Sequence, residues 1–537
     1  MSTLSIHSKE IAKGTVWSVL GTLFFKVCAF LYVILITRVA AQDDVGVLYL
    51  CLSIAGTIGI LSDFGIVSSF IRYIPYFQGK NETVKIFDIL KMGYLTVIVS
   101  VILAFLLFWQ AEAIALFYHL PSLASGLRFF SVYLLLNAFS KIFSNALNGF
   151  ADMFPIQLSS SLQNFLKLVL TIILFQYNGP NLDSLVFGYV LSFIPSSLIL
   201  FFFMNKKLSK IEPHGTGITN SELMAEILPF GIMLMILNSF AILLNYADKL
   251  VLGYVLEPET SASLLGVYSV AYNLAFVVLT FPSAVGSIFL PVASRLFGKN
   301  DIDGLCSLIH TSQRWLLFIT LPVGTVLIVF AETLLTSFYG TSYSSGASVV
   351  MLCTAAFVLN SITIVISYVL AAMRLVQIEL RILGAAAFVN IASMFFLVPL
   401  FGINGAALAT ILRCIVSVTL LTYYGRKIIG YAFPSEVYKL IAVFITTIAV
   451  MFLLKPYLIP FLDALPDMGN SYINKISAFA LLVVFSVFTL IFFMALSLIV
   501  KCFKPDDISL MKSVLDRMRM PVQISSFIIQ IANAGVK

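Results

Sequence analysis

The chain has 537 residues, of which 60% are hydrophobic and only 11% charged, and its mean hydropathy is +1.03. Soluble domains carry about 25% charged residues, so the composition excludes a soluble enzyme or a nucleic-acid-binding domain and indicates a polytopic membrane protein. The six cysteines and four histidines are scattered without paired spacing. We therefore expect no disulfide framework, metal site or cofactor.

Apolar runs long enough to cross a bilayer follow one another along the whole chain. A bilayer core takes about 20 apolar residues per helix, and interruptions rich in Gly, Pro, Asn or charge separate fourteen such runs. The predicted fold class is an all-α polytopic membrane protein with about 14 transmembrane helices. The predicted spans are 16–38, 46–71, 93–117, 127–150, 156–178, 184–204, 227–253, 264–292, 313–336, 346–372, 379–400, 403–425, 438–457 and 476–500.

Lysine and arginine concentrate in every second loop. Residues 72–91, 206–210 and 295–314 hold several cations each, whereas the alternate loops read AQDD, NGPNLD and LEPETS. Short cytoplasmic loops carry an excess of Lys and Arg, so the pattern predicts an even number of helices with both termini in the cytoplasm. We expect the membrane to be the plasma membrane. A twelve-helix count would require the last pair of spans to be re-entrant.

Two segments of the chain resemble each other. VGVLYLCLSIAGTIGILSDFG, from Val45, matches LGVYSVAYNLAFVVLTFPSAV, from Leu265, and the two copies end in GKNE and GKND. Six helices separate the copies, so both have the same orientation, which predicts parallel repeats about an axis along the membrane normal. We expect an N-lobe of six helices (1–210), a C-lobe of six (211–430), helices 13 and 14 (431–500) and a cytosolic or membrane-surface tail (501–537). Two lobes related in this way commonly expose a midplane site to each side in turn, as in a transporter.

Three lysines lie deep within predicted spans, where an ionisable group costs about 2.5–3.5 kcal/mol on insertion scales. They are Lys26, Lys141 and Lys167. Residues three or four apart share a helix face, and each lysine belongs to a polar stripe that we expect to face inward. The stripes are Thr15, Ser18, Thr22 and Lys26; Asn137, Lys141, Asn145 and Asn148; and Ser160, Asn164, Lys167 and Thr171.

The charge balance at mid-depth is positive. Arg413 joins the lysines, against Asp63 within the second span and Asp248 in the seventh. A cationic chamber favours phosphate or diphosphate, because charge-assisted hydrogen bonds offset desolvation. The alternative is that each lysine neutralises an aspartate or the carbonyl end of a helix, and Asp63 fits a counter-ion, a proton carrier or a helix cap equally well. The predicted substrate-binding residues are Lys26, Lys141, Lys167, Arg413, Asn137, Asn145 and Asn164, and Asp63 and Asp248 are candidates for coupling to H⁺ or Na⁺.

Several runs of sequence resemble a known family. RVAAQDDVGVLYL, LSDFGIVSSFIRYIPYF, ADKLVLGYVL and VPLFGINGAALATILR are similar to the polysaccharide biosynthesis, or oligosaccharide flippase, branch of the multidrug/oligosaccharidyl-lipid/polysaccharide exporter superfamily. The resemblance implies a two-lobe exporter that flips a polyprenyl-diphosphate-linked oligosaccharide to the outer leaflet by alternating access. Lys26, Lys141 and Lys167 would line its cationic cavity. The first lobe lacks the dense arginines of the peptidoglycan-precursor flippases, which disfavours that substrate.

Two other functions compete with the flippase. A cation-coupled multidrug exporter of the related branch requires acidic residues in its chamber, whereas the predicted chamber is rich in lysine. A membrane-embedded glycosyltransferase or polymerase requires a sizeable catalytic loop, and the longest connections are only about 20 residues. The expected partners are the lipid-linked oligosaccharide, membrane lipids and the glycosyltransferases or polymerase of the same pathway.

Overall fold

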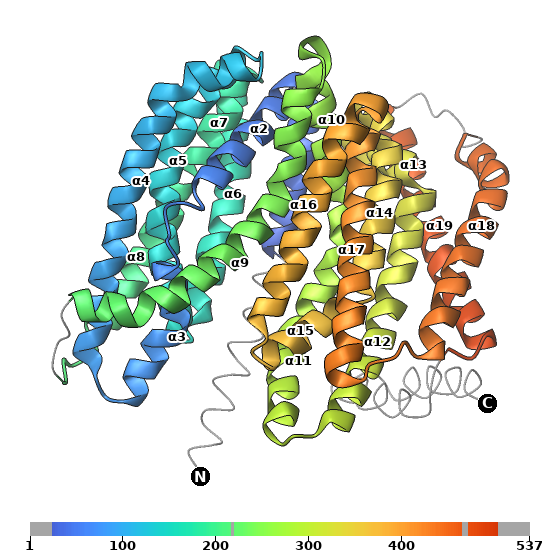
Figure 1. Ribbon diagram of the computed structural model, residues 1–537. Helices are drawn as coiled ribbons and strands as arrows, with labels where there is room; N and C mark the ends of the chain where they lie inside the picture. Colours follow the sequence, from blue (N-terminus) through green and yellow to red (C-terminus); the bar gives the residue numbers. More distant parts are fainter. Residues whose placement is uncertain (1–23, 216–219, 464–470, 503–537) are drawn as a thin grey trace. The chain divides into compact units, whose positions relative to one another are not determined.

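The computed structural model describes residues 24–215, 220–463 and 471–502, and these ranges are helical apart from short turns (Figure 1). Over the described residues, each of the predicted spans coincides with a helix or with consecutive helices. Twelve are long and apolar enough, over their described residues, to cross a membrane. Three further helices are not among these twelve, because their described residues are too few to cross a membrane. They are the first helix, described over 24–39, α2 (Gln42–Ile58) and α3 (Ile66–Gly79). The prediction of an all-α multi-pass membrane protein is confirmed.

The chain divides into two compact units. The first contains the residues up to Ser269 together with Val398–Ile403, and the second contains Val270–Leu397 and the residues from Asn404 onward. The predicted lobes, 1–210 and 211–430, stay a prediction. After α2 and α3, the first unit holds α4 (Thr83–Phe117), α5 (Ser122–Gly149), α6 (Met153–Asn178), α7 (Leu182–Leu191), α8 (Phe193–Leu208), α9 (Asn220–Val255) and the start of α10 (Pro258–Phe276).

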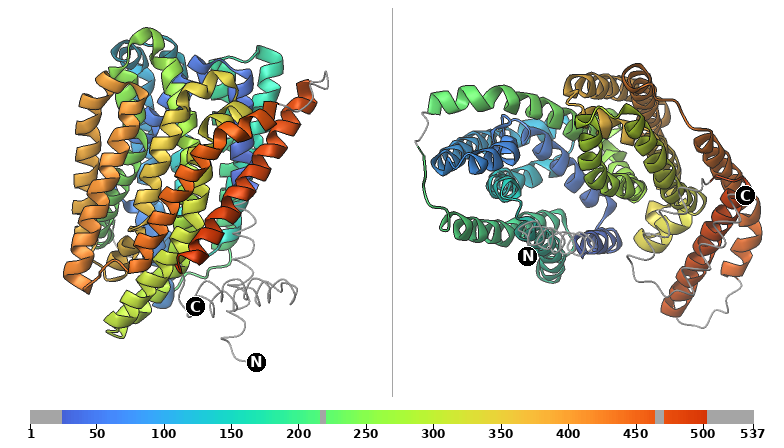
Figure 2. Two further views of the ribbon diagram at one scale, coloured as in Figure 1. Left: turned by 90° about the vertical axis from the view of Figure 1, so that its right-hand side faces the viewer. Right: turned by 90° about the horizontal axis from the view of Figure 1, so that it is seen from below.

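The second unit continues from α10 to the end of the described chain. Within it, α18 and α19 pack side by side, and α12 packs against both (Figure 2). Its elements are η1 (Val277–Leu279), α11 (Thr280–Gly298), α12 (Ile302–Val329), α13 (Ala331–Tyr339), η2 (Thr341–Gly346), α14 (Ala347–Ser361), α15 (Ile364–Ala372), α16 (Val376–Phe401), α17 (Ile403–Ile429), α18 (Ser435–Asp463) and α19 (Ser471–Ile499).

The second predicted span is broken. One continuous helix over 46–71 is wrong, because the chain leaves the helix after Ile58 and resumes it at Ile66. Phe64 and Gly65 have φ angles of +45° and +74°, in the left-handed region that ends helices and that glycine adopts most readily. Gly65 also touches α9, since a β-carbon on it would lie 1.7 Å from the carbonyl oxygen of Gly231. Asp63 therefore lies in the break and not inside a helix.

The two copies of the repeat meet in the first unit. A β-carbon on Gly46 would lie 1.8 Å from the carbonyl oxygen of Ala262, and one on Gly266 would lie 2.5 Å from that of Gln42. Gly46 corresponds to Gly266 in the repeat, and Gln42 to Ala262, so the contact is reciprocal. Reciprocal contact is the mark of a twofold relation, and it supports the parallel repeat. We call it the glycine crossing of α2 and α10.

Hydroxyl hydrogen bonds hold together the helices that carry two of the lysines. The hydroxyls of Ser140 in α5 and Ser197 in α8 are 2.7 Å apart, and the Ser159 hydroxyl in α6 donates to the Ser196 carbonyl at 2.9 Å. In lipid, helices associate through small residues and such hydrogen bonds, since apolar contacts to lipid tails compete with apolar contacts between helices. These bonds fix α5 and α6 against α8.

Candidate functional site

Lys167 lies in the interior of the first unit. Its side chain is buried, and its ammonium group donates to Oδ1 of Asn164, one turn earlier in α6, at 2.9 Å. The ammonium also lies 4.4 Å from the ring centroid of Tyr32 in the first helix and 5.2 Å from that of Tyr189 in α7. Both distances are within the range of a cation–π interaction. Among the described residues, no carboxylate forms an ion pair with Lys167.

Further tyrosines surround this lysine, and together they form what we call the tyrosine cluster. The rings of Tyr133 and Tyr189 are 6.0 Å apart, Tyr49 and Tyr246 lie close enough to Tyr189 to act on it electrostatically, and a β-carbon on Gly56 would strike the Tyr246 ring at 2.4 Å. The cluster thus draws on the first helix, α2, α5, α7 and α9. Its members are Tyr32, Tyr49, Tyr133, Tyr189 and Tyr246.

Sequence reasoning missed the tyrosine cluster. A weak signal was present, because tyrosine in membrane helices is enriched at the two interfaces, whereas Tyr32 and Tyr189 lie six and five residues inside the ends of the predicted spans 16–38 and 184–204. Hydropathy alone does not register this difference in depth. The spacing that groups Asn164 with Lys167 identified only the polar stripe on α6.

Two hydroxyls beside Lys167 are left without a hydrogen bond. Tyr32 and Thr171 are neighbours, yet within the described chain neither hydroxyl completes a hydrogen bond of ordinary geometry. Buried polar groups are nearly always paired with protein, water or ligand. The two hydroxyls beside the buried ammonium therefore have hydrogen-bonding capacity left for a polar guest.

Lys141 lies half-buried on α5 and interacts electrostatically with Asp63. The side-chain amide of Asn145 donates to the Lys141 carbonyl at 2.9 Å, so this asparagine is partly engaged by its own helix. Asn137, one turn earlier on α5, is half-buried as well. Lys141 and Asp63 thus influence each other electrostatically but form no ion pair among the described residues. Substrate contacts of the asparagines stay a prediction.

Asp63 caps the start of α3. Its Oδ1 accepts from the backbone N–H of Val67 at 2.8 Å, and its Oδ2 accepts from the Ser68 hydroxyl at 2.6 Å. The first amides of a helix have no partner within the helix, so a carboxylate there stabilises both the amides and the helix dipole. Asp63 was expected to be a counter-ion, a proton carrier or a helix cap. Its hydrogen bonds are those of a helix cap, and Lys141 acts on it as a counter-charge. A proton-carrying role stays a prediction.

Lys26 lies on the first helix and is half-buried. That helix packs against α6, where the rings of Phe24 and Phe165 are 6.4 Å apart. The remaining members of its predicted stripe, Thr15, Ser18 and Thr22, lie outside the described residues. Lys26 and Lys167 therefore occupy neighbouring helices of the first unit.

Asp248 is a buried carboxylate on α9. Its Oδ2 accepts from the hydroxyl of Tyr268 at 2.7 Å, while its Oδ1 has no hydrogen-bond partner in the part of the chain that the structure describes. The next residue, Lys249, donates to the Asn245 carbonyl at 3.1 Å. A buried carboxylate oxygen without a partner is costly, and a bound proton or cation would remove that cost.

Arg413 lies half-buried on α17, in the second unit. The contacts described above all fall within the first unit and do not include it. The grouping of Arg413 with the three lysines stays a prediction.

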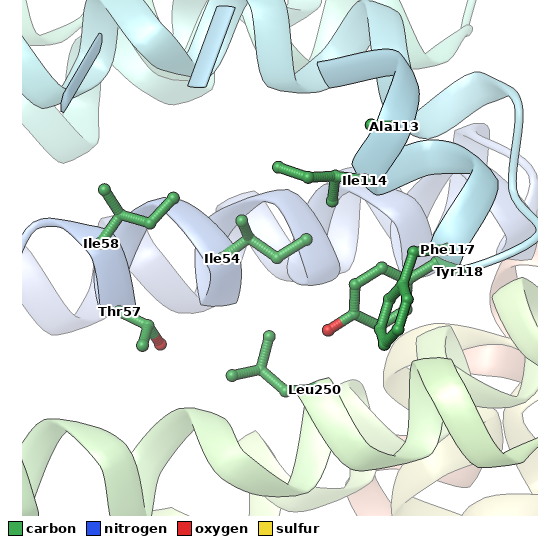
Figure 3. A pocket seen from close by; sticks show the side chains of 8 residues that line it. All are labelled: Ile54, Thr57, Ile58, Ala113, Ile114, Phe117, Tyr118 and Leu250. Carbon is green, nitrogen blue, oxygen red and sulfur yellow. The ribbon is translucent and has the colours of Figure 1, made fainter. Parts of the chain in front are cut away.

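An apolar pocket lies between α2, α4 and α9 of the first unit (Figure 3). Its volume is about 370 Å³, and the side chains of Ile54, Ile114 and Leu250 point toward one another across it, with the Tyr118 hydroxyl also directed inward. Such a lining suits a hydrocarbon chain and excludes a charged head group. The lining residues are Ile54, Thr57, Ile58, Ala113, Ile114, Phe117, Tyr118 and Leu250.

Comparison with known sequences gives consistent matches. The profile of the family described as polysaccharide biosynthesis protein matches residues 35–348. An uncharacterized membrane protein of Methanocaldococcus jannaschii is 23% identical over 453 residues, which cover 81% of this chain and 88% of that protein. The probable low-salt glycan biosynthesis flippase Agl15 of Haloferax volcanii is 23% identical over 189 residues, 35% of this chain and 39% of the relative.

Solved structures share the fold. The lipid II flippase MurJ, in an inward closed conformation, superposes with a TM-score of 0.65 at 16% identity, covering 88% of this chain and 98% of MurJ. A multidrug resistance MATE transporter of the MOP superfamily, in an inward-facing conformation, gives 0.61 at 13% identity and covers 76% of this chain and 94% of the transporter. At these identities the likeness establishes the fold alone.

Proposed function

The chain belongs to the polysaccharide biosynthesis protein family, and from this premise we propose that it flips a polyprenyl-diphosphate-linked oligosaccharide from the cytoplasmic to the outer leaflet by alternating access. Two proteins similar to this chain carry flippase names: Agl15 is named a probable low-salt glycan biosynthesis flippase, and MurJ, which shares the fold, a lipid II flippase. These names favour a transporter over a glycosyltransferase for this chain.

One observation carries the proposal, the buried ammonium of Lys167 among tyrosines. The described residues provide it with an amide oxygen and two aromatic faces but no carboxylate. A diphosphate would supply the missing negative charge through charge-assisted hydrogen bonds. The tyrosine rings suit the apolar faces of sugars, and their hydroxyls suit the sugar hydroxyls. Lys26, Lys141 and Arg413 would add positive charge along the path.

The polyprenyl chain has a different requirement, since its burial is driven by apolar area alone. The pocket of Figure 3 is apolar and lies on the same unit as the lysines. We propose that it holds part of the isoprenoid chain while the head group crosses.

The first test changes Lys26, Lys141 and Lys167 together to Gln in a strain that lacks the native protein. Because Gln keeps polarity and removes the charge, we expect export of the lipid-linked glycan to fall by about tenfold or more, the effect of losing 1.4 kcal/mol or more of differential binding. The measurement is surface glycan, with membrane abundance of the variant as reference.

The matched control is Lys91→Gln combined with two other exposed lysines, Lys299→Gln and Lys427→Gln, which removes the same charge from exposed positions. Arginine at all three interior positions should retain part of the export. Full export by the glutamine variant would contradict the assignment of these lysines.

Coupling to an ion is proposed for Asp248, because its Oδ1 is buried and without a partner in the described chain. Asp248→Asn should leave the protein folded, since the amide oxygen can still accept from Tyr268, but should abolish the dependence of transport on a proton or Na⁺ gradient. Transport by proteoliposomes under imposed gradients of each ion measures this. An unchanged gradient dependence would remove Asp248 from the coupling step.

A cation-coupled multidrug exporter is the second candidate, and the buried carboxylate of Asp248 is the observation that favours it. Expression in a drug-sensitive, pump-deficient strain separates the two functions. Resistance to cationic drugs that disappears in Asp248→Asn would support the exporter, whereas the flippase predicts no resistance.

A further inference from the structure

A second pocket of the first unit has the opposite character to the one in Figure 3. It lies where the end of α8 meets the end of α3 and the turn between α5 and α6, and its volume is about 400 Å³. Three lysines line it, Lys206, Lys207 and Lys210, against one carboxylate, Asp152. We call it the lysine pocket. No residue discussed for the transport path belongs to it.

The positive charge of the lysine pocket is largely uncompensated. Lys207 reaches Asp152 only at 4.0 Å, and neither Lys206 nor Lys210 forms an ion pair within the described ranges of the chain. Lysines in the last turn of a helix interact favourably with its dipole, which accounts for Lys206 and Lys207. It does not account for Lys210, because α8 ends at Leu208.

Hydrogen bonds hold the walls of the pocket in place. The segment that follows Lys210 is fastened to the start of α4, where the Thr83 hydroxyl donates to the Glu212 carbonyl at 2.6 Å and accepts from the His214 N–H at 2.7 Å. On the opposite wall, the N–H of Asp152 donates to the Leu147 carbonyl at 2.9 Å and closes the turn. A site whose walls are fixed beforehand loses less entropy when it binds.

Apolar side chains accompany the lysines. Phe203 and Ile211 line the same pocket, and the Lys207 ammonium lies 5.9 Å from the ring centroid of Phe150. A site for a free phosphate ion needs no such surface, whereas a lipid presents a phosphate and a hydrocarbon chain together. The pocket also lies on the side that the distribution of Lys and Arg predicts to be cytoplasmic.

We propose that the lysine pocket binds the phosphate group of a membrane lipid in the cytoplasmic leaflet. Lys206 and Lys210 contact the phosphate oxygens, Lys207 is shared between the phosphate and Asp152, and Phe203 and Ile211 cover the start of the hydrocarbon chain. Two lipids have this chemistry, a bulk anionic phospholipid and the polyprenyl diphosphate of the proposed substrate.

Binding to the full chain in phosphatidylcholine nanodiscs tests the proposal and distinguishes these sources. The probes are phosphatidylglycerol, a polyprenyl diphosphate without sugars, and soluble pyrophosphate. The variant is Lys206→Gln, Lys207→Gln and Lys210→Gln together, and the matched control is Lys91→Gln, Lys299→Gln and Lys427→Gln. The wild type and the control should bind at least one of the two lipids about tenfold or more tightly than the variant, and added salt should weaken that binding.

Preference for polyprenyl diphosphate over phosphatidylglycerol would make the pocket a docking site for substrate, and the reverse would make it a site for bulk lipid. The proposal would be overturned if the variant bound each of the two lipids as tightly as the wild type does. It would also be overturned if the wild type bound pyrophosphate but neither lipid. None of these results depends on glycan export, so the flippase assignment can fail while the lipid site stands. Lipid binding can likewise be lost while the flippase assignment stands.

Discussion

Asp63 illustrates how one carboxylate serves a break in a membrane helix. It accepts from the Val67 amide and the Ser68 hydroxyl, and these bonds stabilise the start of α3. Sequence spacing placed Asp63 at mid-span but did not distinguish a cap from a carrier, because that choice depends on the two left-handed residues that follow it. Lys141 and Lys167 could be singled out in the sequence because they lie deep within predicted spans. The aromatic partners of Lys167 come from other helices, and the sequence did not predict them.

A pair of substitutions separates these roles of Asp63. Asp63→Ala removes both hydrogen bonds and should lower the free energy of unfolding by about 1–2 kcal/mol, as for other lost caps. Asp63→Asn keeps one acceptor and should cost less, with export retained. Thermal unfolding of the purified protein and glycan export provide the measurements. Ser68→Ala, which removes only one donor, is the control, and loss of export in a stably folded Asp63→Asn would indicate a carrier instead.

At the scale of elements, the positions of the apolar spans were predictable and their continuity was not. Five predicted spans consist of consecutive helices: α2 with α3, α7 with α8, α10 with η1 and α11, α12 with α13, and α14 with α15. Apolar composition continues across each interruption, so hydropathy cannot detect it. The break after α2 coincides with Gly65, whose close approach to Gly231 on α9 is a tertiary contact between residues far apart in the chain.

The glycine crossing of α2 and α10 gives a prediction at this scale. Gly46→Ala places a methyl group 1.8 Å from a carbonyl oxygen, so the two helices must separate, and overpacking of this kind costs about 1–3 kcal/mol. Gly266→Ala should act similarly. Gly79→Ala, where a β-carbon would meet nothing within 4 Å, is the matched control. Thermal unfolding in detergent compares the three, and equal stability of all of them would contradict the crossing.

At the scale of the molecule, the sequence predicted the all-α multi-pass architecture, and the resemblance predicted the family. Both follow from signals that act along the chain: apolar length, loop charge and short motifs. The tyrosine cluster and the lysine pocket were not predicted, because each is assembled from helices whose contacts depend on packing. Phe203 and Asp152, for example, are 51 positions apart in the sequence. They line the same pocket because of how α3, α8 and the turn between α5 and α6 pack together.

The glycine crossing bears on how such a chain arose. Its reciprocal contact is the one that two separate copies of a half-length protein make when they associate as a twofold dimer. In that ancestor a single mutation at the one glycine would insert two methyl groups at once. Gene duplication and fusion remove this constraint, because each glycine can then change alone. The two copies of the repeat then become free to diverge.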